Sequence, residues 1–254
     1  MGKKFTVVVL CLAIATTVCA IVLAIRVVPH EADLAAARRE LADVVPIGTN
    51  PGAVWLRLEA YEAQMREINP DYVGLLMVEG AEIFNPVVRG RDNVRYLHTS
   101  FGGAENRFGA VFMDYRNVGD DLPHIIIYGH NVGDESGRGL MLNWLFRFLD
   151  EQFKAAHPVV VFIEDGKRSE FEIFSVRITD VYDPAYQLDF DAPGSFDAFL
   201  ERNGAPPDAP QILTLSTCTF GDCEDGRVIL QGWLRHVAPV DTAEIQVRWC
   251  AVSM

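Results

Sequence analysis

The sequence lacks the cysteine and histidine patterns that hold metal ions or build disulfide-rich domains. It has five cysteines and six histidines in 254 residues, with no Cys-x-x-Cys pair and no His-x-x-x-His pair. Zinc sites commonly use such closely spaced ligands, and disulfide scaffolds use more cysteines in a smaller domain. We therefore expect neither a metal site nor a disulfide scaffold. Internal repeats and low-complexity tracts are also missing, so one substantial domain is expected.

An excess of basic charge is missing as well. The chain has 22 Lys and Arg against 35 Asp and Glu, a net charge of −13. Two of the basic residues, Lys3 and Lys4, precede the first apolar run, so the remainder carries 20 against 35 and a net charge near −15. Such an acidic domain argues against nucleic acid or anionic lipid as a partner. Solubility explains the acidity most simply, and attraction of a cationic amine substrate is the alternative.

Residues 5–25 form an uncharged, mostly apolar run of 21 residues. As a helix it would be about 30 Å long, the thickness of the hydrocarbon core of a bilayer. Lys3 and Lys4 place residues 1–4 in the cytoplasm by the positive-inside rule. We expect a single-pass plasma-membrane anchor, then an N-terminal helical region at 26–68 and an extracytoplasmic domain at 69–254. A cleaved signal peptide is the alternative, but the run is long and its small-x-small cleavage site is poor.

Three cysteines lie outside this apolar run: Cys218, Cys223 and Cys250. An odd number outside the membrane leaves at least one thiol unpaired or used in an intermolecular bridge. Cys11 and Cys19 lie within the run and are expected to pack there. The sequence leaves open whether Cys223 pairs with Cys218 on oxidation.

Beyond the anchor, helices are predicted at 31–44 and 53–68, the second with an apolar stripe at Trp55, Leu58, Tyr61 or Glu62, and Met65. Eight short β-branched or aromatic segments follow, at 72–78, 87–88, 110–113, 124–128, 159–163, 171–178, 211–216 and 228–234. This pattern predicts a mainly β domain, a barrel or a sandwich. Helical insertions are predicted at 139–155 and 195–202, and Asp165-Gly166 predicts a hairpin turn.

Cys218 is a candidate nucleophile. It follows the predicted strand at 211–216 and precedes the polar loop at 219–225, a position where a side chain can meet a substrate. The alternative is a small hydrophobe that ends a strand. A free thiol has a pKa of about 8.5, so a thiol nucleophile needs a neighbouring base or cation.

His130 and Arg227 are the candidates for that base and that cation. His130 closes the apolar strand at 124–128, and Gly129 allows close backbone approach. If the strands on either side of residues 219–225 form a hairpin, Arg227 folds back beside Cys218, where a guanidinium could stabilise a thiolate and an oxyanion. The alternatives are a structural histidine and a surface ion pair of Arg227 with Asp222, Glu224 or Asp225.

Taken together, these motifs resemble the sortases, specifically class B. The segments that carry the resemblance are Leu213-Thr214-Leu215-Ser216-Thr217-Cys218-Thr219, Tyr128-Gly129-His130-Asn131 and Asp225-Gly226-Arg227-Val228. Longer similar stretches at 68–74, 85–93, 96–98 and 109–117 extend the likeness over about residues 55–236. It departs after Gly74, where Leu75 stands in place of a frequent Trp.

The resemblance implies an eight-stranded sortase barrel with N-terminal helices, and a cysteine transpeptidase that needs no cofactor. It implies that Cys218 attacks a sorting-signal threonine near the C-terminus of an exported protein, with His130 as general acid and base and Arg227 holding the oxyanion. It implies further that Asn93, Leu97, Ser216 and Thr217 line the substrate groove. The acceptor would be an amine of peptidoglycan or of its lipid-linked precursor.

Two other functions fit parts of the sequence. A sortase that polymerises pilins often carries an Asp-Pro-aromatic lid ahead of the first strand, but Asn69-Pro70-Asp71-Tyr72 resembles the class B junction better and Asp183-Pro184-Ala185-Tyr186 comes too late. A membrane-anchored binding module on a degenerate barrel is the other alternative. The intact set of Cys218, His130 and Arg227 argues against it.

Overall fold

The computed structural model describes residues 54–56, 58–78, 83–220, 225–240 and 245–247, and the single positions 35 and 39. The predicted anchor at 5–25 lies outside the described residues. Of the predicted helix at 31–44, only Ala35 and Arg39 are described, and both are helical. Within the described part of the chain, no helix has the length and apolar character needed to span a membrane.

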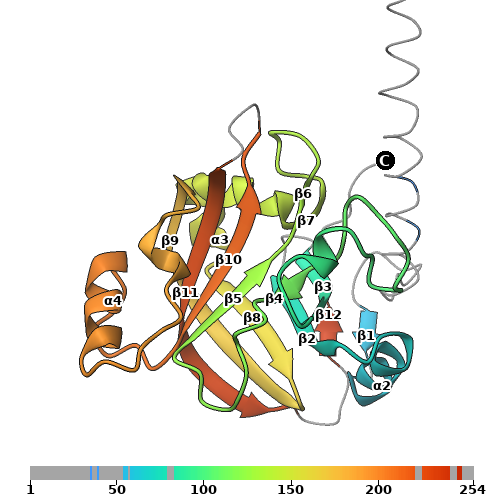
Figure 1. Ribbon diagram of the computed structural model, residues 1–254, viewed down its shortest axis with the longest axis horizontal. Coiled ribbons are helices and arrows are strands. Elements are labelled where there is room, and N and C mark those ends of the chain that lie inside the picture. The colour runs from blue at the N-terminus through green and yellow to red at the C-terminus, as the bar shows by residue number, and fades with distance from the viewer. Residues whose placement is uncertain are drawn as a thin grey trace, which may run out of the picture.

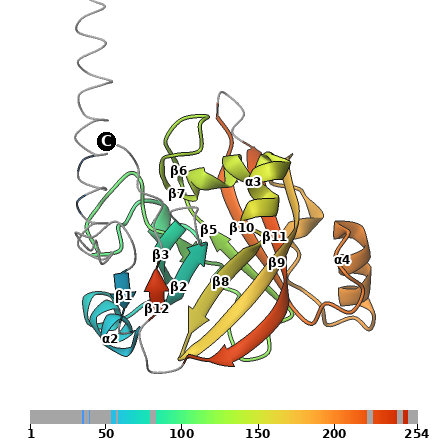
Figure 2. The same ribbon diagram turned by 180° about the vertical axis from the view of Figure 1, so that it is seen from behind.

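Eight strands close a mixed β-barrel in the order β10-β11-β9-β8-β2-β3-β4-β5 (Figures 1 and 2). Neighbours are antiparallel except for the parallel pairs β3–β4 and β5–β10. Each of the eight predicted segments overlaps one of these strands, so the predicted eight-stranded barrel is confirmed. The strands are β2 (Tyr72–Val78), β3 (Ile83–Val88), β4 (Phe112–Met113), β5 (His124–Tyr128), β8 (Val159–Glu164), β9 (Lys167–Asp180), β10 (Ile212–Cys218) and β11 (Gly226–Pro239).

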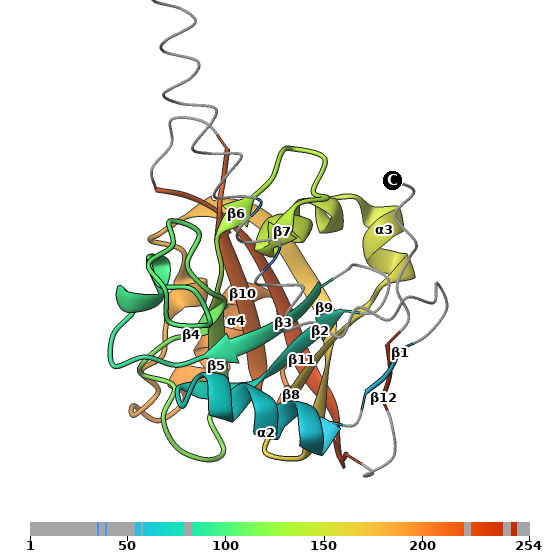
Figure 3. The ribbon, with the colours of Figure 1, turned by 90° about the vertical axis from the view of Figure 1, so that its right-hand side faces the viewer.

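Strand β2 shows how the core is built. Leu76 and Val78 point into the barrel, whereas Leu75 and Met77 point outward, because successive side chains of a strand alternate between its faces. Helix α2 (Leu58–Ile68) covers the outward face and crosses the barrel on that side (Figure 3). Both faces of the strand are therefore buried, which explains its unbroken apolar sequence. The predicted helix stripe is confirmed from Leu58 onward, with Leu58, Tyr61, Glu62 and Met65 buried.

The predicted helix at 53–68 is wrong at its start. Its first residues form strand β1 (Val54–Leu56), which pairs antiparallel with β12 (Ile245–Val247). Trp55 therefore belongs to a strand and not to the helix stripe. β-Branched and aromatic residues suit strands, and a partner distant in the sequence decided between two conformations that local pattern leaves open.

The predicted helix at 139–155 is divided into three elements. Strand β7 (Leu140–Met141) pairs with β6 (Asn131–Val132), the 3₁₀ helix η2 (Leu142–Leu149) follows, and α3 (Glu151–Ala156) completes the segment. Asp150 causes the last break, because its carboxylate accepts the N–H groups of Gln152 and Phe153 and so caps a new helix. Buried side chains of η2 join the interior core of the barrel: Leu142, Trp144, Leu145 and Phe148.

The remaining elements cover the outside of the barrel. Helix α4 (Ser195–Asn203), close to the predicted 195–202, packs through Phe199 and Leu200 against Ile212 of β10 and stands at the left of Figure 1. Two short 3₁₀ turns, η1 (Arg95–Leu97) and η3 (Pro184–Tyr186), precede β4 and α4 respectively. The predicted turn at Asp165 and Gly166 joins β8 to β9 with φ of 48° and 71°.

Candidate active site

Cys218 lies on the outer face of the barrel. Leu213 and Leu215 of β10 belong to the interior core, so Ser216 and Cys218 point outward. Strand β11 runs antiparallel to β10, and its register sets Arg227 opposite Cys218. The two side chains therefore share one face at the same end of the strand pair, as the predicted hairpin requires. The Cys218 residue is exposed and its thiol is free.

His130 follows strand β5, the other neighbour of β10, at the same end of the strands. Strands β5 and β10 are parallel, Tyr128 is in register with Ser216, and the Gly129 N–H donates to the Ser216 carbonyl at 3.1 Å. A Cβ at Gly129 would lie 2.7 Å from Cγ of Leu142, so glycine is needed for the close packing of this corner. Three neighbouring strands thus bring the three predicted catalytic residues together.

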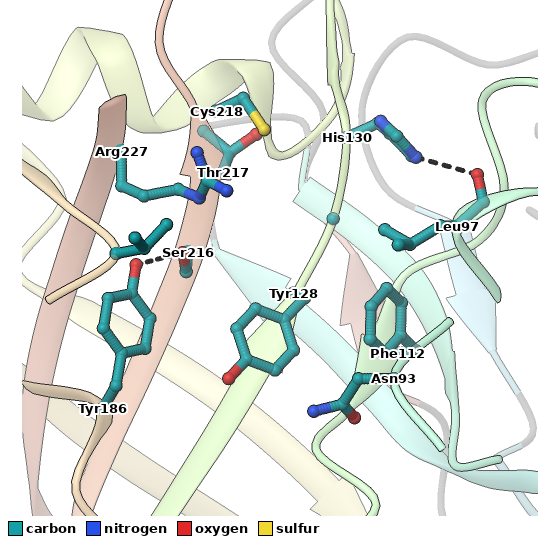
Figure 4. Close-up of a pocket in the computed structure, with 12 residues that line it drawn as sticks. Asn93, Leu97, Phe112, Tyr128, His130, Tyr186, Ser216, Thr217, Cys218 and Arg227 are labelled. Atoms are coloured by element: carbon teal, nitrogen blue, oxygen red, sulfur yellow. Dashed lines mark hydrogen bonds between the residues drawn. The ribbon is translucent and has the colours of Figure 1, made fainter. Parts of the chain in front are cut away.

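A pocket of about 310 Å³ lies over these strand ends (Figure 4). All seven residues predicted for the site line it: Asn93, Leu97, His130, Ser216, Thr217, Cys218 and Arg227. The sequence did not assign a site role to five more lining residues: Phe112, Tyr128, Gly129, Val181 and Tyr186. The pocket therefore joins residues from β4, β5, β10, β11 and the connections after β3, β5 and β9.

The imidazole of His130 is engaged by backbone. Its Nε2 lies 2.9 Å from the carbonyl oxygen of Leu97, so this nitrogen carries the proton and donates it. Figure 4 shows the ring pointing toward Leu97 and away from Cys218. Burial lowers the pKa of His130, against the opposing effect of the Leu97 carbonyl, and His98 lowers it further. The neutral imidazole is therefore favoured in this arrangement.

Arg227 presents its guanidinium to the same corner. Nη1 donates to the Gly226 carbonyl at 2.8 Å, and the side chain reaches from β11 toward Thr217 and Cys218 (Figure 4). Two acidic residues considered as alternative ion-pair partners, Asp222 and Glu224, lie outside the described residues, as does Cys223. A cation beside an exposed thiol favours the thiolate and any oxyanion formed on attack.

Tyr186 forms the opposite wall of the pocket. Its hydroxyl is 2.8 Å from Ser216 Oγ, and its ring stacks on Tyr128 with centroids 6.4 Å apart and planes 14° apart. Asp183 starts the η3 turn by accepting the Ala185 N–H, and Pro184 occupies its first position. This Asp-Pro pair, a cap followed by a proline, is a sequence signal for the turn that ends at Tyr186.

Asp114 holds two residues of the pocket wall, Asn93 and Tyr128, in place. Its buried carboxylate accepts hydrogen bonds from Asn93 Nδ2 at 2.9 Å and from the Tyr128 hydroxyl at 3.0 Å. Burial acts to raise the pKa of Asp114, but the hydrogen bonds from Arg116 and Asn93 hold it below its usual value. The Tyr115 N–H donates to Asn93 Oδ1 at 3.0 Å, so the amide of Asn93 is fixed at both ends.

The chemistry of this corner follows from its side chains. Among the residues that the structure describes, no three His, Cys, Asp or Glu side chains are grouped so that they could hold a metal ion. What the corner offers is an exposed thiol, a neutral imidazole and a guanidinium around one pocket. That set suits attack on a carbonyl group followed by proton transfer to or from an amine.

Known proteins have sequences similar to this chain. No family model matches the chain. A sortase B of Listeria monocytogenes is 34% identical over 183 residues, which cover 67% of this chain and 72% of that protein. A sortase B of Staphylococcus aureus is 31% identical over 166 residues, which cover 61% of this chain and 66% of that protein.

Solved structures give the same result. The crystal structure of sortase B from B. anthracis matches with a TM-score of 0.66 and 27% sequence identity. The match covers 80% of this chain and 97% of that one. The resemblance stated from the motifs is therefore confirmed, and the chain belongs to the sortase B family of cysteine transpeptidases.

Proposed function

We propose that the pocket over β5, β10 and β11 is the transpeptidase centre and that it processes exported proteins bearing a C-terminal sorting signal. The observation that carries the proposal is the placement of Cys218, Arg227 and His130 at one end of three adjacent strands, around a single pocket. Asn93, Leu97, Ser216 and Thr217 would contact the sorting peptide. Tyr186 and Tyr128 extend the same groove.

The reaction has two half-reactions. The Cys218 thiol first gives its proton to His130. Its Sγ then attacks the carbonyl carbon of a threonine in the sorting signal, forming a C–S bond, and the Arg227 guanidinium holds the tetrahedral oxyanion. The C–N bond then breaks, and protonated His130 gives its proton to the departing amine. In the second half-reaction an acceptor amine attacks the thioester and loses its proton to His130. The C–S bond breaks, and the Cys218 thiolate is released.

The acceptor in this proposal is an amine of peptidoglycan or of its lipid-linked precursor. The predicted anchor at 5–25 would hold the enzyme at the plasma membrane, where exported substrates and lipid-linked acceptors meet. A thioester must outlast hydrolysis to reach such an acceptor, and the apolar side chains of Leu97, Phe112 and Val181 exclude water from part of the pocket. The acidic surface of the domain suits a cationic acceptor.

The test uses the full chain with a library of internally quenched peptides and a panel of candidate amines, followed by mass spectrometry of the products. Cys218→Ala should abolish both cleavage and transfer, whereas Cys223→Ala should keep most of the activity. Equal loss in both variants would overturn the assignment of a single nucleophile. Cleavage that never yields a product joined to an amine would overturn transfer as the function.

A further inference from the structure

Strands β5 and β10 part immediately beyond the pocket. The Gly129 N–H donates to the Ser216 carbonyl at 3.1 Å, and this is the last backbone rung between them. Two residues after Gly129, the backbone of Asn131 belongs to β6 and pairs with Met141 of β7. His130 therefore lies in the corner where the backbone leaves one sheet for another.

The side chain of Asn131 supplies the rung that the backbone no longer makes. Its Nδ2 donates to the carbonyl oxygen of Cys218 at 3.0 Å. Donor and acceptor are each two residues beyond Gly129 and Ser216, which is the repeat of an evenly spaced parallel ladder. The side-chain amide thus takes the place of a backbone N–H.

A second amide fixes the orientation of the first. The fully buried Asn143 donates from Nδ2 to Asn131 Oδ1 at 2.6 Å, and its own Oδ1 accepts the Gly139 N–H at 2.6 Å. Oxygen and nitrogen of the Asn131 amide therefore cannot exchange places without losing partners on both sides. The Nδ2 atom is held facing the Cys218 carbonyl.

We propose that Asn131 is a positioning residue that sets the separation between His130 and Cys218 through this side-chain rung. The proposal rests on the proposed roles of those two residues. The bond joins the residue that follows the general acid and base to the backbone of the nucleophile itself. Without it, the end of β10 would be tied to the corner only as far back as Ser216. Misplacement of catalytic groups by about 1 Å can lower a rate about 100-fold.

The opposite end of the same strand pair provides a matched control. There the Gln211 side chain donates from Nε2 to the Leu122 carbonyl at 2.5 Å, again joining the segments that lead into β10 and β5. Gln211 and Asn131 thus make the same kind of bond at the two ends of β5 and β10, but only Asn131 adjoins the pocket. A role limited to sheet stability would make the two residues equivalent.

The experiment compares Asn131→Ala and Asn131→Asp with Gln211→Ala and Gln211→Glu in the full chain. The probe is the internally quenched peptide that the wild-type chain cleaves fastest in a library. We expect both Asn131 variants to lower kcat at least about tenfold with KM within about twofold of wild type. The peptide-facing groups Asn93 and Tyr186 are tied elsewhere, so the KM should hold. Both Gln211 variants should keep the wild-type kcat after correction for any unfolded fraction.

Three results would overturn the proposal: wild-type kcat in Asn131→Ala, equal loss of kcat in the Gln211 variants, or a defect in Asn131→Asp alone. If Asn131→Ala fails to fold in thermal unfolding, Asn131→Asp decides, because it has the same shape and still accepts from Asn143. Loss of the hydrogen bond to Cys218 should lower the kcat of Asn131→Asp at every pH. An effect of the added charge alone would only shift the pH profile along the pH axis, and that result would contradict the proposal. Cleavage by Cys218→Ala at the wild-type rate would instead refute the proposed function.

Discussion

The hydrogen bond from His130 Nε2 to the Leu97 carbonyl, 2.9 Å long, turns the proposed general acid and base away from the proposed nucleophile. Both residues line the substrate pocket. A peptide that enters the pocket beside Leu97 therefore occupies the same part of the pocket as the His130 ring. Proton delivery to a leaving amine requires the ring to keep one nitrogen free for the substrate while the other is oriented by the protein.

This environment makes a prediction about pH dependence. Burial lowers the pKa of His130 and His98 lowers it further, so His98→Gln should raise it. The limb of the pH profile of kcat/KM that belongs to His130 should move to higher pH in this variant, because the imidazole then keeps its proton over a wider range. His236→Gln, which changes an exposed histidine far along β11, is the control and should leave the limb in place. A His98→Gln profile that stays fixed or moves to lower pH would contradict the assignment.

Arg227→Lys tests whether shape as well as charge is required. A lysine keeps one positive charge but loses the planar fork that reaches Gly226 and the thiol corner at once. We expect kcat/KM for peptide cleavage to fall about 100-fold, the usual cost of one oxyanion donor. The control is Arg235→Lys, on the same strand and paired with Glu172, which should stay within about twofold of wild type. Near-normal turnover of Arg227→Lys would remove Arg227 from the reaction.

Asp183→Asn tests the wall that carries Tyr186. Arg177 binds the two carboxylate oxygens of Asp183 at 2.6 and 3.0 Å, and the same carboxylate accepts from Ala185 N and from Thr179 Oγ1. Loss of the charge should loosen the η3 turn, so that KM rises several-fold more than kcat falls. The free energy of unfolding should drop by about 1–3 kcal/mol.

The control for this wall is Glu172→Gln, which weakens an exposed ion pair with Arg235 and should change neither KM nor stability measurably. Steady-state kinetics and chemical denaturation of the same samples give both readouts. A variant Asp183→Asn whose kcat falls while KM holds would mean that the turn serves the chemical step and not the binding of the peptide.

The strands could be foreseen from local signals, and the resemblance to a known family then pointed to the barrel and to the proposed catalytic set. Strand β5 at 124–128 is apolar, β-branched and bounded by turn residues, and the spacing between Cys218 and Arg227 fits a hairpin. Period-two alternation then puts Ser216 and Cys218 on the same face without any knowledge of the fold.

Features that depend on distant partners were not foreseen. Strand β1 needs β12 from the other end of the chain, and nothing near Val54 announces that partner. Asp114 reads as one of many surface carboxylates, and only its burial beneath Asn93 and Tyr128 reveals that it orders the pocket. Asn131 lay inside a recognised motif, but its bond to Cys218 depends on two strands that diverge in space.

The last prediction concerns the fully buried His124 and the stability of the fold in acid. His124 Nδ1 lies 2.8 Å from the Gln187 carbonyl and Nε2 lies 2.8 Å from Thr214 Oγ1. The ring is therefore a neutral imidazole that donates from Nδ1 and accepts from the threonine. Burial lowers the pKa of His124 to about 4, from the ordinary value of about 6.5.

The sign follows from proton binding. Between about pH 6.5 and pH 4 the unfolded chain binds a proton at His124 and the folded chain does not. The free energy of unfolding therefore falls as the pH falls through this window. The loss amounts to about 3 kcal/mol over the whole window. Asp114 and Asp183, whose pKa values are held low, withdraw their stabilisation as pH falls below about 4, the ordinary carboxyl value.

Chemical denaturation at a series of pH values measures this effect. His124→Gln should be less stable than wild type at pH 7 by about 1–2 kcal/mol, because its amide replaces the two ring hydrogen bonds imperfectly. Its free energy of unfolding should nevertheless fall less between pH 6.5 and pH 4. His130, whose pKa is also lowered, contributes equally to both proteins, so the difference between them isolates His124. His236→Gln, at an exposed site, should keep the wild-type slope, and parallel curves for His124→Gln and wild type would show that His124 does not set the acid sensitivity of the fold.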